Sequence, residues 1–382
     1  MINPRNNHVS RIQLGALTCA TLGIVGCIAG AFINSRQFFI SYLFGYLFWL
    51  GLALGCLGVA MVHHLTGGRW GFVIRRFLES GFRTLPLMML LFVPLVFGMR
   101  VLYPWTTNPP AGQKAHYLNI PGFIARTLVF FVVWLVLAGL LRKWSLRQDS
   151  TPDPEPTRRM RTISGPGIVI YPLTATFAYI DWVMSLEPDW YSTIFLVIII
   201  IGQILSAFAF AIVVLASFRA HTPFANVLQP FHFHHLGNLL LTFVMFWTYI
   251  AFSQLLIIWS GNLPHEISWY LHRSTGSWIW IVAALALFHF FLPFFLLLFR
   301  TVKRNADLLA WIAGAVLVMH LINVFWLIVP SFYPRGIHIS WLDFAAPLGI
   351  GGLWVALFLF RLKQSPLLPQ NDPRFTYLHI DE

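Results

Sequence analysis

Apolar residues fill long, nearly uninterrupted stretches of this chain, and most charged residues lie in the short segments between them. A stretch of about 20 apolar residues is what an α-helix needs to cross the hydrocarbon core of a bilayer. The pattern therefore predicts an all-α polytopic membrane protein with about ten transmembrane helices. The expected spans are residues 14–33, 40–61, 85–102, 122–141, 167–186, 194–218, 236–259, 276–299, 308–329 and 341–360.

Composition excludes an ordinary soluble domain. Hydrophobic residues make up 58% of the 382 positions and charged residues only 10%, whereas a soluble domain carries about 25% charged residues. A water-soluble fold has too little interior to bury so much apolar surface, while a bilayer solvates the outer surface of a helix bundle. The excess of basic residues, a net charge of +12, is therefore interpreted as loop charge rather than as a nucleic-acid site.

The distribution of lysine and arginine predicts the orientation. If ten spans are crossed in turn, 19 of the 25 basic residues lie on the side that carries the N terminus, here called side one, and the other 6 lie on side two. Basic residues collect in cytoplasmic loops. We therefore expect side one to be cytoplasmic, with both ends of the chain on it.

One polar segment divides the chain. Residues 142–165 are rich in proline and charge and lack an apolar period, which predicts a flexible cytoplasmic linker. The expected parts are helices 1–4 in residues 1–141, the linker, helices 5–10 in 166–362, and a cytoplasmic tail in 363–382. The first apolar run exceeds the length of a signal-peptide core, and no clear cleavage site follows it, so we expect it to remain as a span.

The cysteine and histidine patterns argue against a metal centre. The three cysteines, Cys19, Cys27 and Cys56, form no CxxC pair, which excludes zinc ribbons, iron–sulfur clusters and CxxCH haem attachment within this chain. A pair of haem ligands on one helix is disfavoured because Pro223 and Pro230 interrupt the stretch that holds His221 and His235. We expect no covalent cofactor and no metal ligands.

Several polar residues are expected at membrane depth or at the mouths of spans. An ionisable group in the hydrocarbon region is costly, so it normally faces a cavity or a partner. Each single residue has a structural interpretation, because a buried histidine or carboxylate often only satisfies its neighbours. Together they are candidates for a proton path or a quinone pocket. These candidates are Asp181, Glu187, Asp189, His289, His320, Asn323 and Asp343.

The first span carries small residues at every fourth position, from Gly15 through Gly23 to Ala31. Such a ridge lets another helix approach closely. Two interpretations stay open from the sequence: packing against a neighbouring span of the same chain, or docking against another subunit.

Five segments of the second half resemble the larger polytopic subunits of bacterial alternative complex III, a quinol:cytochrome c oxidoreductase. They read DWVMSLEPDWYST (181–193), AFSQLLIIWSGNLPHE (251–266), HFFLPFFLLLFRTVKRN (289–305), FWLIVP (325–330) and NDPRF (371–375). Their order and spacing are most similar to the F-type member, which is called quinone-binding subunit 2 and belongs to the NrfD/PsrC-like group of quinone-interacting membrane anchors. The resemblance covers roughly the last 210 residues, and the first part matches only in its span pattern.

The resemblance implies two four-helix bundles with two outer helices, in a bacterial inner membrane. It implies partners that include iron–sulfur and multihaem cytochrome c subunits and a homologous membrane subunit, with menaquinone or ubiquinone as the quinone. Asn323 departs from the family pattern, which often has an acid there. A neutral amide cannot relay a proton by ionising, so this departure puts a proton path through the ninth span in doubt.

The sequence therefore favours a subunit without a redox centre, in a quinol-oxidising complex, with a structural role and with quinone binding and proton conduction as candidate roles. Two other classes stay open. One is a secondary transporter with a polar site at the bilayer midplane, and the other is a purely structural membrane anchor.

Overall fold

The computed structural model describes residues 7–372, and these form an all-helical bundle with ten helices long and apolar enough to cross a membrane. The chain is therefore a multi-pass membrane protein, as its hydrophobic pattern predicts. The spans are α1 (Asn7–Ile33), α2 (Ser35–Thr66), α3–α5 (Arg69–Phe97), α8 (Ile120–Ser150), α9 (Glu155–Trp182), α10 (Thr193–Phe218), α12 (Pro230–Gly261), α14–α15 (Trp278–Leu298), α17 (Ala306–Ile328) and α18 (Leu342–Lys363). The second half of the expected tail, residues 373–382, lies outside the described residues.

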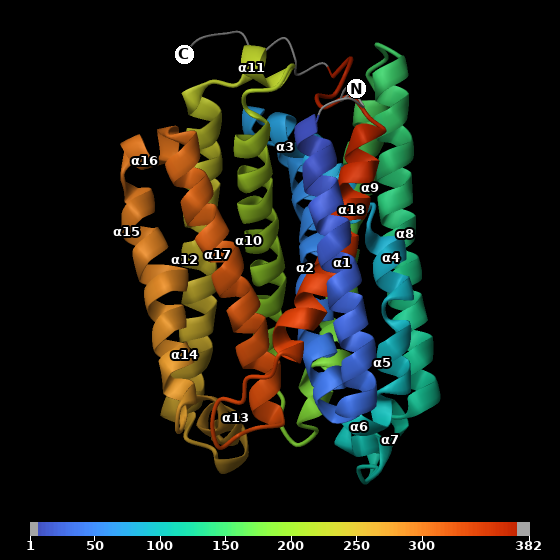
Figure 1. Cartoon of the computed structure of the whole chain (residues 1–382), viewed down its shortest axis with the longest axis vertical. Coiled ribbons are helices and arrows are strands. Elements are labelled where there is room, and N and C mark those ends of the chain that lie inside the picture. The colour runs from blue at the N-terminus through green and yellow to red at the C-terminus, as the bar shows by residue number, and fades with distance from the viewer. Residues whose placement is uncertain (1–6, 373–382) are drawn as a thin grey trace.

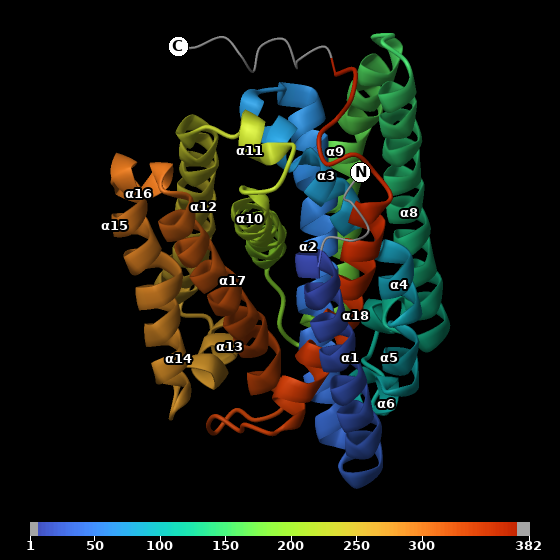
Figure 2. The ribbon, with the colours of Figure 1, turned by 45° about the horizontal axis from the view of Figure 1, so that its top comes forward.

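The spans are arranged as two bundles of four and an outer pair (Figure 1). Bundle one holds α2, α3–α5, α8 and α9, and bundle two holds α10, α12, α14–α15 and α17. The outer helices α1 and α18 pack along each other and against α2 (Figure 2). The start of α1 and the end of α18 lie at the same end of the molecule, which is side one (Figure 1).

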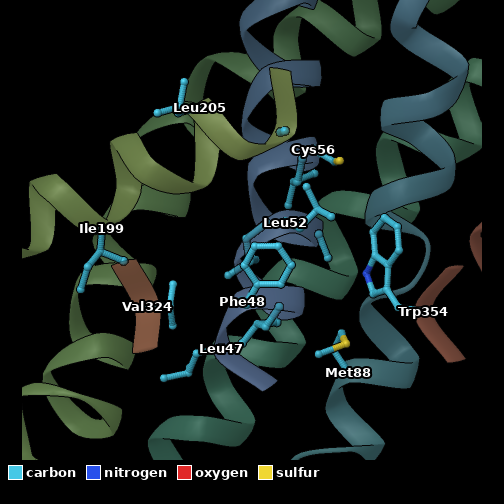
Figure 3. Close-up of a cluster of buried hydrophobic side chains, with 14 of the residues drawn as sticks. Leu47, Phe48, Leu52, Cys56, Met88, Ile199, Leu205, Val324 and Trp354 are labelled. Carbon is cyan, nitrogen blue, oxygen red and sulfur yellow. The ribbon is translucent and has the colours of Figure 1, made fainter. Parts of the chain in front are cut away.

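Helix α2 is the centre of the packing, because it contacts both bundles and the outer pair. Its side chains Phe48 and Leu52 are buried, and Ile199 of α10, Val324 of α17 and Trp354 of α18 converge around them (Figure 3). Lipid tails are as apolar as these side chains, so van der Waals packing rather than burial from water holds such helices together. The outward faces of α1 and α12 expose leucine, valine and phenylalanine, as a bilayer-solvated surface requires.

The small-residue ridge of α1 packs within the chain. A Cβ atom at Gly23 would overlap the backbone of Gly349 in α18, and one at Gly352 would overlap the backbone at Ala20. At Gly15 an added Cβ would meet only open space. The middle of the ridge therefore serves the α1–α18 contact, which answers the question that the sequence leaves open for this part of the helix.

The third span begins earlier than the hydrophobic pattern predicts, at Arg69 rather than near residue 85. Helix α3 (Arg69–Phe82) is buried from Gly71 to Phe82, although this stretch contains the three charged residues Arg75, Arg76 and Glu79. The charges are compensated by an ion-pair cluster at side one, which joins α3, α8 and the segment after α18. Its members are Arg75, Arg76, Glu79, Arg142, Asp149 and Asp372.

Glu79 is the hub of this ion-pair cluster. Its carboxylate accepts from Arg75 Nε at 2.9 Å, from an Arg76 guanidinium nitrogen at 2.6 Å and from Arg142 at 3.1 Å. Arg75 also donates to Asp372 at 2.9 Å, and Arg76 pairs with Asp149. Three cations face three anions, so a charged stretch that looks like a loop in a hydropathy pattern is buried as a helix.

The segment expected to be an irregular linker is largely helical. Helix α8 continues to Ser150 and α9 begins at Glu155, which leaves only residues 151–154 outside the helices. Ser145 and Gln148 on this extension of α8 hydrogen-bond the arginines of the ion-pair cluster. At the start of α9, Pro156 occupies the first turn, where its missing N–H removes no hydrogen bond within the helix. In the same turn Glu155 forms an ion pair with Arg159 at 2.6 Å. Polar contacts therefore take the place of the missing apolar period.

Candidate functional site

Two of the predicted site residues meet in bundle two. The rings of His289 and His320 lie with their centroids 6.1 Å apart, and the indole of Trp247 lies 4.3 Å from His289. Both histidines are buried, with 0% and 5% exposed. His289 lies at the middle of a span of 21 residues, about 15 Å from either end at 1.5 Å per residue. The group Trp247, His289 and His320 is called the histidine cluster below.

Local sequence features place these rings. His289 lies in the π-helical turn η3 (Leu285–Phe291), between α14 (Trp278–Ala284) and α15 (Leu292–Leu298). Such widened turns often occur at functional sites. His320 fits against α10 because residue 202 is glycine: a Cβ there would lie 2.7 Å from His320 Cε1. The two helices can therefore approach closely enough for the imidazole to reach the junction of the bundles.

The histidine cluster has few hydrogen-bond partners within residues 7–372. Both ring nitrogens of His289, Nδ1 of His320 and Nε1 of Trp247 have none there. A buried polar group without a partner costs about 1–3 kcal/mol. Groups of this kind are normally paired with an ordered water when the protein supplies no partner.

A small cavity adjoins the cluster where the two bundles meet. It has a volume of about 20 Å³ and is lined by His320, Asn323, Gln203 and Tyr179, among apolar residues of α2, α10 and α17. A cavity needs roughly 10–15 Å³ to hold one water. Gln203 accepts from the Tyr171 hydroxyl at 2.6 Å, while its own Nε2 has no partner in the described part of the chain. One water beside His320 therefore has polar groups to bind from both bundles.

Asp181 lies apart from the histidine cluster, in an ion pair within bundle one. Arg126 donates to both of its carboxylate oxygens, from Nε at 2.8 Å and from a terminal nitrogen at 3.0 Å. The same guanidinium stacks on the ring of Tyr117 at 3.9 Å. A bidentate pair of this kind fixes geometry strongly. The arrangement therefore favours a positioning role for Asp181 over the role of a free proton acceptor.

Glu187 joins the end of bundle one to bundle two. Arg273 of α13 (Pro264–Ser274) binds its carboxylate at 2.8 Å, and the Ser331 hydroxyl donates to it at 2.7 Å. Burial acts to raise the pKa of Glu187, but Arg273 and Ser331 hold that pKa below its usual value. Burial in turn lowers the pKa of Arg273 to about 10, so both groups are charged at neutral pH. Asp189, two residues further on, is exposed.

Asp343, near the start of α18, is bound by neutral groups. Its carboxylate accepts from the Ser41 hydroxyl at 2.6 Å, from Gln37 at 3.0 Å and from the Ser340 backbone N–H at 2.7 Å. Gln37 in turn accepts from the Tyr333 hydroxyl at 2.9 Å. The structure shows no ion pair to Asp343 from any residue between 7 and 372. Of the predicted carboxylates in spans, Asp343 is therefore the one whose charge is not already matched by a cation.

The candidates thus fall into separate groups. His289, His320 and Asn323 lie together at the bundle junction, while Asp181, Glu187 and Asp343 occupy three different sites toward side two, and Asp189 is at the surface. The sequence pattern does not indicate Trp247, Gln203 and Arg126 as partners of the site residues. Gln203 had a signal, because it is a lone amide in the apolar run of residues 194–218. Between residues 7 and 372 there is no group of three or more metal-binding side chains.

Comparison with known proteins adds no family. No protein-family model matches the chain, and no curated protein matches it.

Proposed function

We propose that this chain is an integral membrane subunit of a quinol-oxidising electron-transfer complex of the alternative complex III type, and that its histidine cluster takes part in proton conduction. The observation that carries the proton role is the set of buried nitrogens of His289, His320 and Trp247 at mid-depth. A purely structural bundle gains nothing from such groups, because each costs free energy when it has no partner. The motif set of the second half supports the type of complex.

Imidazole chemistry fits this role. A histidine exchanges a proton near neutral pH and can pass it between its two nitrogens. In the proposal, the two rings and one water in the adjoining cavity form the middle of the route, and Gln203, which the Tyr171 hydroxyl holds in place, orients that water. Asn323 lines the cavity as a hydrogen-bond partner and does not ionise. His320 therefore takes the place of the acid that the family pattern has in this helix.

Toward side two, Asp343 is the proposed acceptor. Its hydrogen bonds from Ser41 and Gln37 leave it without a cation, so it can gain and lose a proton without breaking an ion pair. Asp181 and Glu187 are assigned positioning roles, because Arg126 and Arg273 already bind them.

Quinone contact is proposed for an apolar cavity of about 400 Å³ between α1, α2, α5 and α18. Its lining includes Cys27, Phe38, Tyr42 and Ile350, and the Tyr42 hydroxyl already donates to the Leu91 carbonyl at 2.8 Å. These residues fit an isoprenoid chain. A quinone head group needs placed polar partners, so we place no redox step in this chain and assign electron transfer to partner subunits.

Co-purification from native membranes tests the complex. An affinity-tagged chain, extracted in a mild detergent, should bring c-type haem and iron–sulfur signals in the same chromatographic peak. The runner-up function, a secondary transporter with a midplane polar site, is favoured by the same histidine cluster. It predicts a peak free of haem together with substrate-dependent uptake, and that result would replace the proposed complex.

A topology experiment tests the proposed orientation in a bacterial inner membrane. Reporter domains inserted at residues 151–154 and after Arg304 should report a cytoplasmic location, and one after Asp189 a periplasmic location. A periplasmic signal at residues 151–154 would reverse the orientation.

A further inference from the structure

A basic pocket lies at side one, where the start of α3 meets bundle two. It has a volume of about 380 Å³ and is formed by the starts of α3 and α12 and by the short helix α16 (Arg300–Arg304). These elements lie at the end of the molecule where α1 begins (Figure 1). Its chemistry comes from three arginines, two histidines and one aromatic ring: Arg69, Arg300, Arg304, His234, His235 and Phe231.

The charge of this pocket is not compensated. None of its lining residues is acidic, and Arg69, Arg300 and Arg304 make no ion pair with any described residue. Arg69 instead stacks over the Phe231 ring at 5.5 Å. The contrast with Arg219 is direct, because that arginine at the same end pairs with Asp307. Convergent guanidinium groups around a hollow are the usual partners of phosphate oxygens.

The first turn of α12 adds to this potential. The helix is 32 residues long and starts at Pro230, on the wall of the pocket. Its dipole favours a negative group at that end, although Pro230 has no N–H and the Gln229–His232 capping box already uses the backbone N–H groups of Gln229 and His232. The pocket therefore combines helix polarity with side-chain charge from two other elements.

Apolar side chains continue from the pocket along the lipid-facing surface. Phe295, Leu298 and Phe299 come shortly before Arg300 in the chain. Their exposed fractions are 55%, 52% and 60%, respectively. In a membrane these groups contact acyl chains. A ligand that combines an anionic phosphate with hydrocarbon chains would satisfy both parts of this surface at once.

We propose that this pocket binds the head group of an anionic phospholipid from the leaflet at side one. Basic pockets between transmembrane helices on the cytoplasmic side suit such head groups. The inference goes beyond the proposed function and is independent of it, since it holds equally for a transporter. Scattered snorkelling arginines would give a general attraction to anionic surfaces, whereas converging ones give a site that saturates.

The test is lipid binding to the purified full chain, with any partners that it retains, measured by native mass spectrometry. The probes are phosphatidylglycerol and, for comparison, phosphatidylcholine. We expect one phosphatidylglycerol to stay bound under conditions that remove phosphatidylcholine. Arg300→Gln with Arg304→Gln should weaken that binding about 30-fold, at about one tenfold step per 1.4 kcal/mol and about 1 kcal/mol per arginine.

The matched control is Arg158→Gln with Arg161→Gln, which removes the same charge from exposed positions at side one on α9. The control should retain phosphatidylglycerol as the unchanged chain does. Equal losses in the two double variants would overturn the proposal, since they would show a general charge effect. Displacement of the lipid by excess inorganic phosphate would also overturn it, because a free anion would then be the ligand.

If the double variant does not fold, the unchanged chain still decides the matter. A single saturable phosphatidylglycerol that resists delipidation supports the site, and equal retention of the two lipids refutes it. The single variant Arg69→Gln, on the opposite wall, gives an independent check with the same direction of effect.

Discussion

The two bundles bury polar side chains in opposite ways. In bundle one, the ion-pair cluster around Glu79 sets three arginines against three carboxylates, so each charge faces its opposite. In bundle two, the histidine cluster buries His289, His320 and Trp247 with most of their ring nitrogens unpartnered in the described structure. The charged groups of the ion-pair cluster bond to one another within the protein, whereas most ring nitrogens of the histidine cluster remain available to bind water.

This difference distinguishes buried polar side chains that stabilise the fold from those that are available for chemistry. A compensated cluster loses stability when one member is removed, because the remaining charge is stranded in a medium of low dielectric constant. An unpartnered cluster has little to lose in stability, and its free nitrogens can bind water and protons. We therefore expect large stability effects when a member of the ion-pair cluster is replaced, and activity effects without large stability effects when a histidine of the histidine cluster is replaced.

Glu79→Gln should give the largest loss. It leaves Arg75, Arg76 and Arg142 without their shared counter-charge, which costs about 3–5 kcal/mol for a buried pair. The measurement is thermal unfolding followed by size-exclusion chromatography of the detergent-solubilised chain. The control Glu155→Gln breaks the exposed pair with Arg159, worth about 0.3–0.5 kcal/mol. Equal melting temperatures for the two variants would contradict the structural role of the ion-pair cluster.

Asp181→Asn should come next. The amide keeps the shape but removes the charge that faces Arg126, and we expect a loss of about 3 kcal/mol in unfolding free energy because Asp181 is fully buried. Asp189→Asn, at an exposed site nearby, is the control. Quinol turnover of the proposed complex gives the second readout. Unchanged stability with strongly reduced turnover would make Asp181 the proton acceptor after all.

Gly202→Ala addresses the packing that holds His320. The added Cβ would press on the imidazole, and such overpacking costs about 1–3 kcal/mol. Gly314→Ala lies on α17 in open space and should be neutral or slightly stabilising, because alanine is the better helix former. Thermal unfolding of both variants checks the difference. If Gly202→Ala were as stable as Gly314→Ala, the close approach of α10 to His320 would be in error.

His289→Phe should have the smallest effect on stability and the clearest effect on function. Phenylalanine fills a similar volume without leaving polar atoms unpaired, so we expect a change below about 1 kcal/mol, of either sign. Proton release during quinol oxidation by the proposed complex should fall strongly. The exposed residue His265 supplies the control variant His265→Phe. A destabilised His289→Phe that still releases protons normally would reverse the assignment of roles.

The sequence is sufficient to predict the ten spans but not to predict where each span begins and ends. Apolar runs specify ten helices because a bilayer demands them, but the start of the third span at Arg69 depends on Asp149 and Asp372, which are distant in sequence. The helical extension of α8 escaped prediction for the same reason. Charge compensation is a property of the assembled bundle, and hydropathy along the chain does not contain it.

The residues of the site could be predicted from the sequence, but the contacts among them could be predicted only in part. His289 and His320 stand out in the sequence because they interrupt apolar runs. The rotation of each helix decides which neighbours they meet. The observed rotations bring Trp247 against His289 and Arg126 against Asp181. Small residues such as Gly202 help to set these rotations through helix packing, which the residue pattern of one helix does not specify.

The close contact between α1 and α18 has a consequence for biosynthesis. The glycines at positions 23 and 349 meet across helices that lie at opposite ends of the amino-acid order. A ribosome delivers α1 to the membrane long before α18 exists, so α1 must wait beside α2 while both bundles assemble. Docking of α18 then closes the molecule. Quality control that monitors the exposed flank of α1 would therefore distinguish finished chains from those whose translation stopped early.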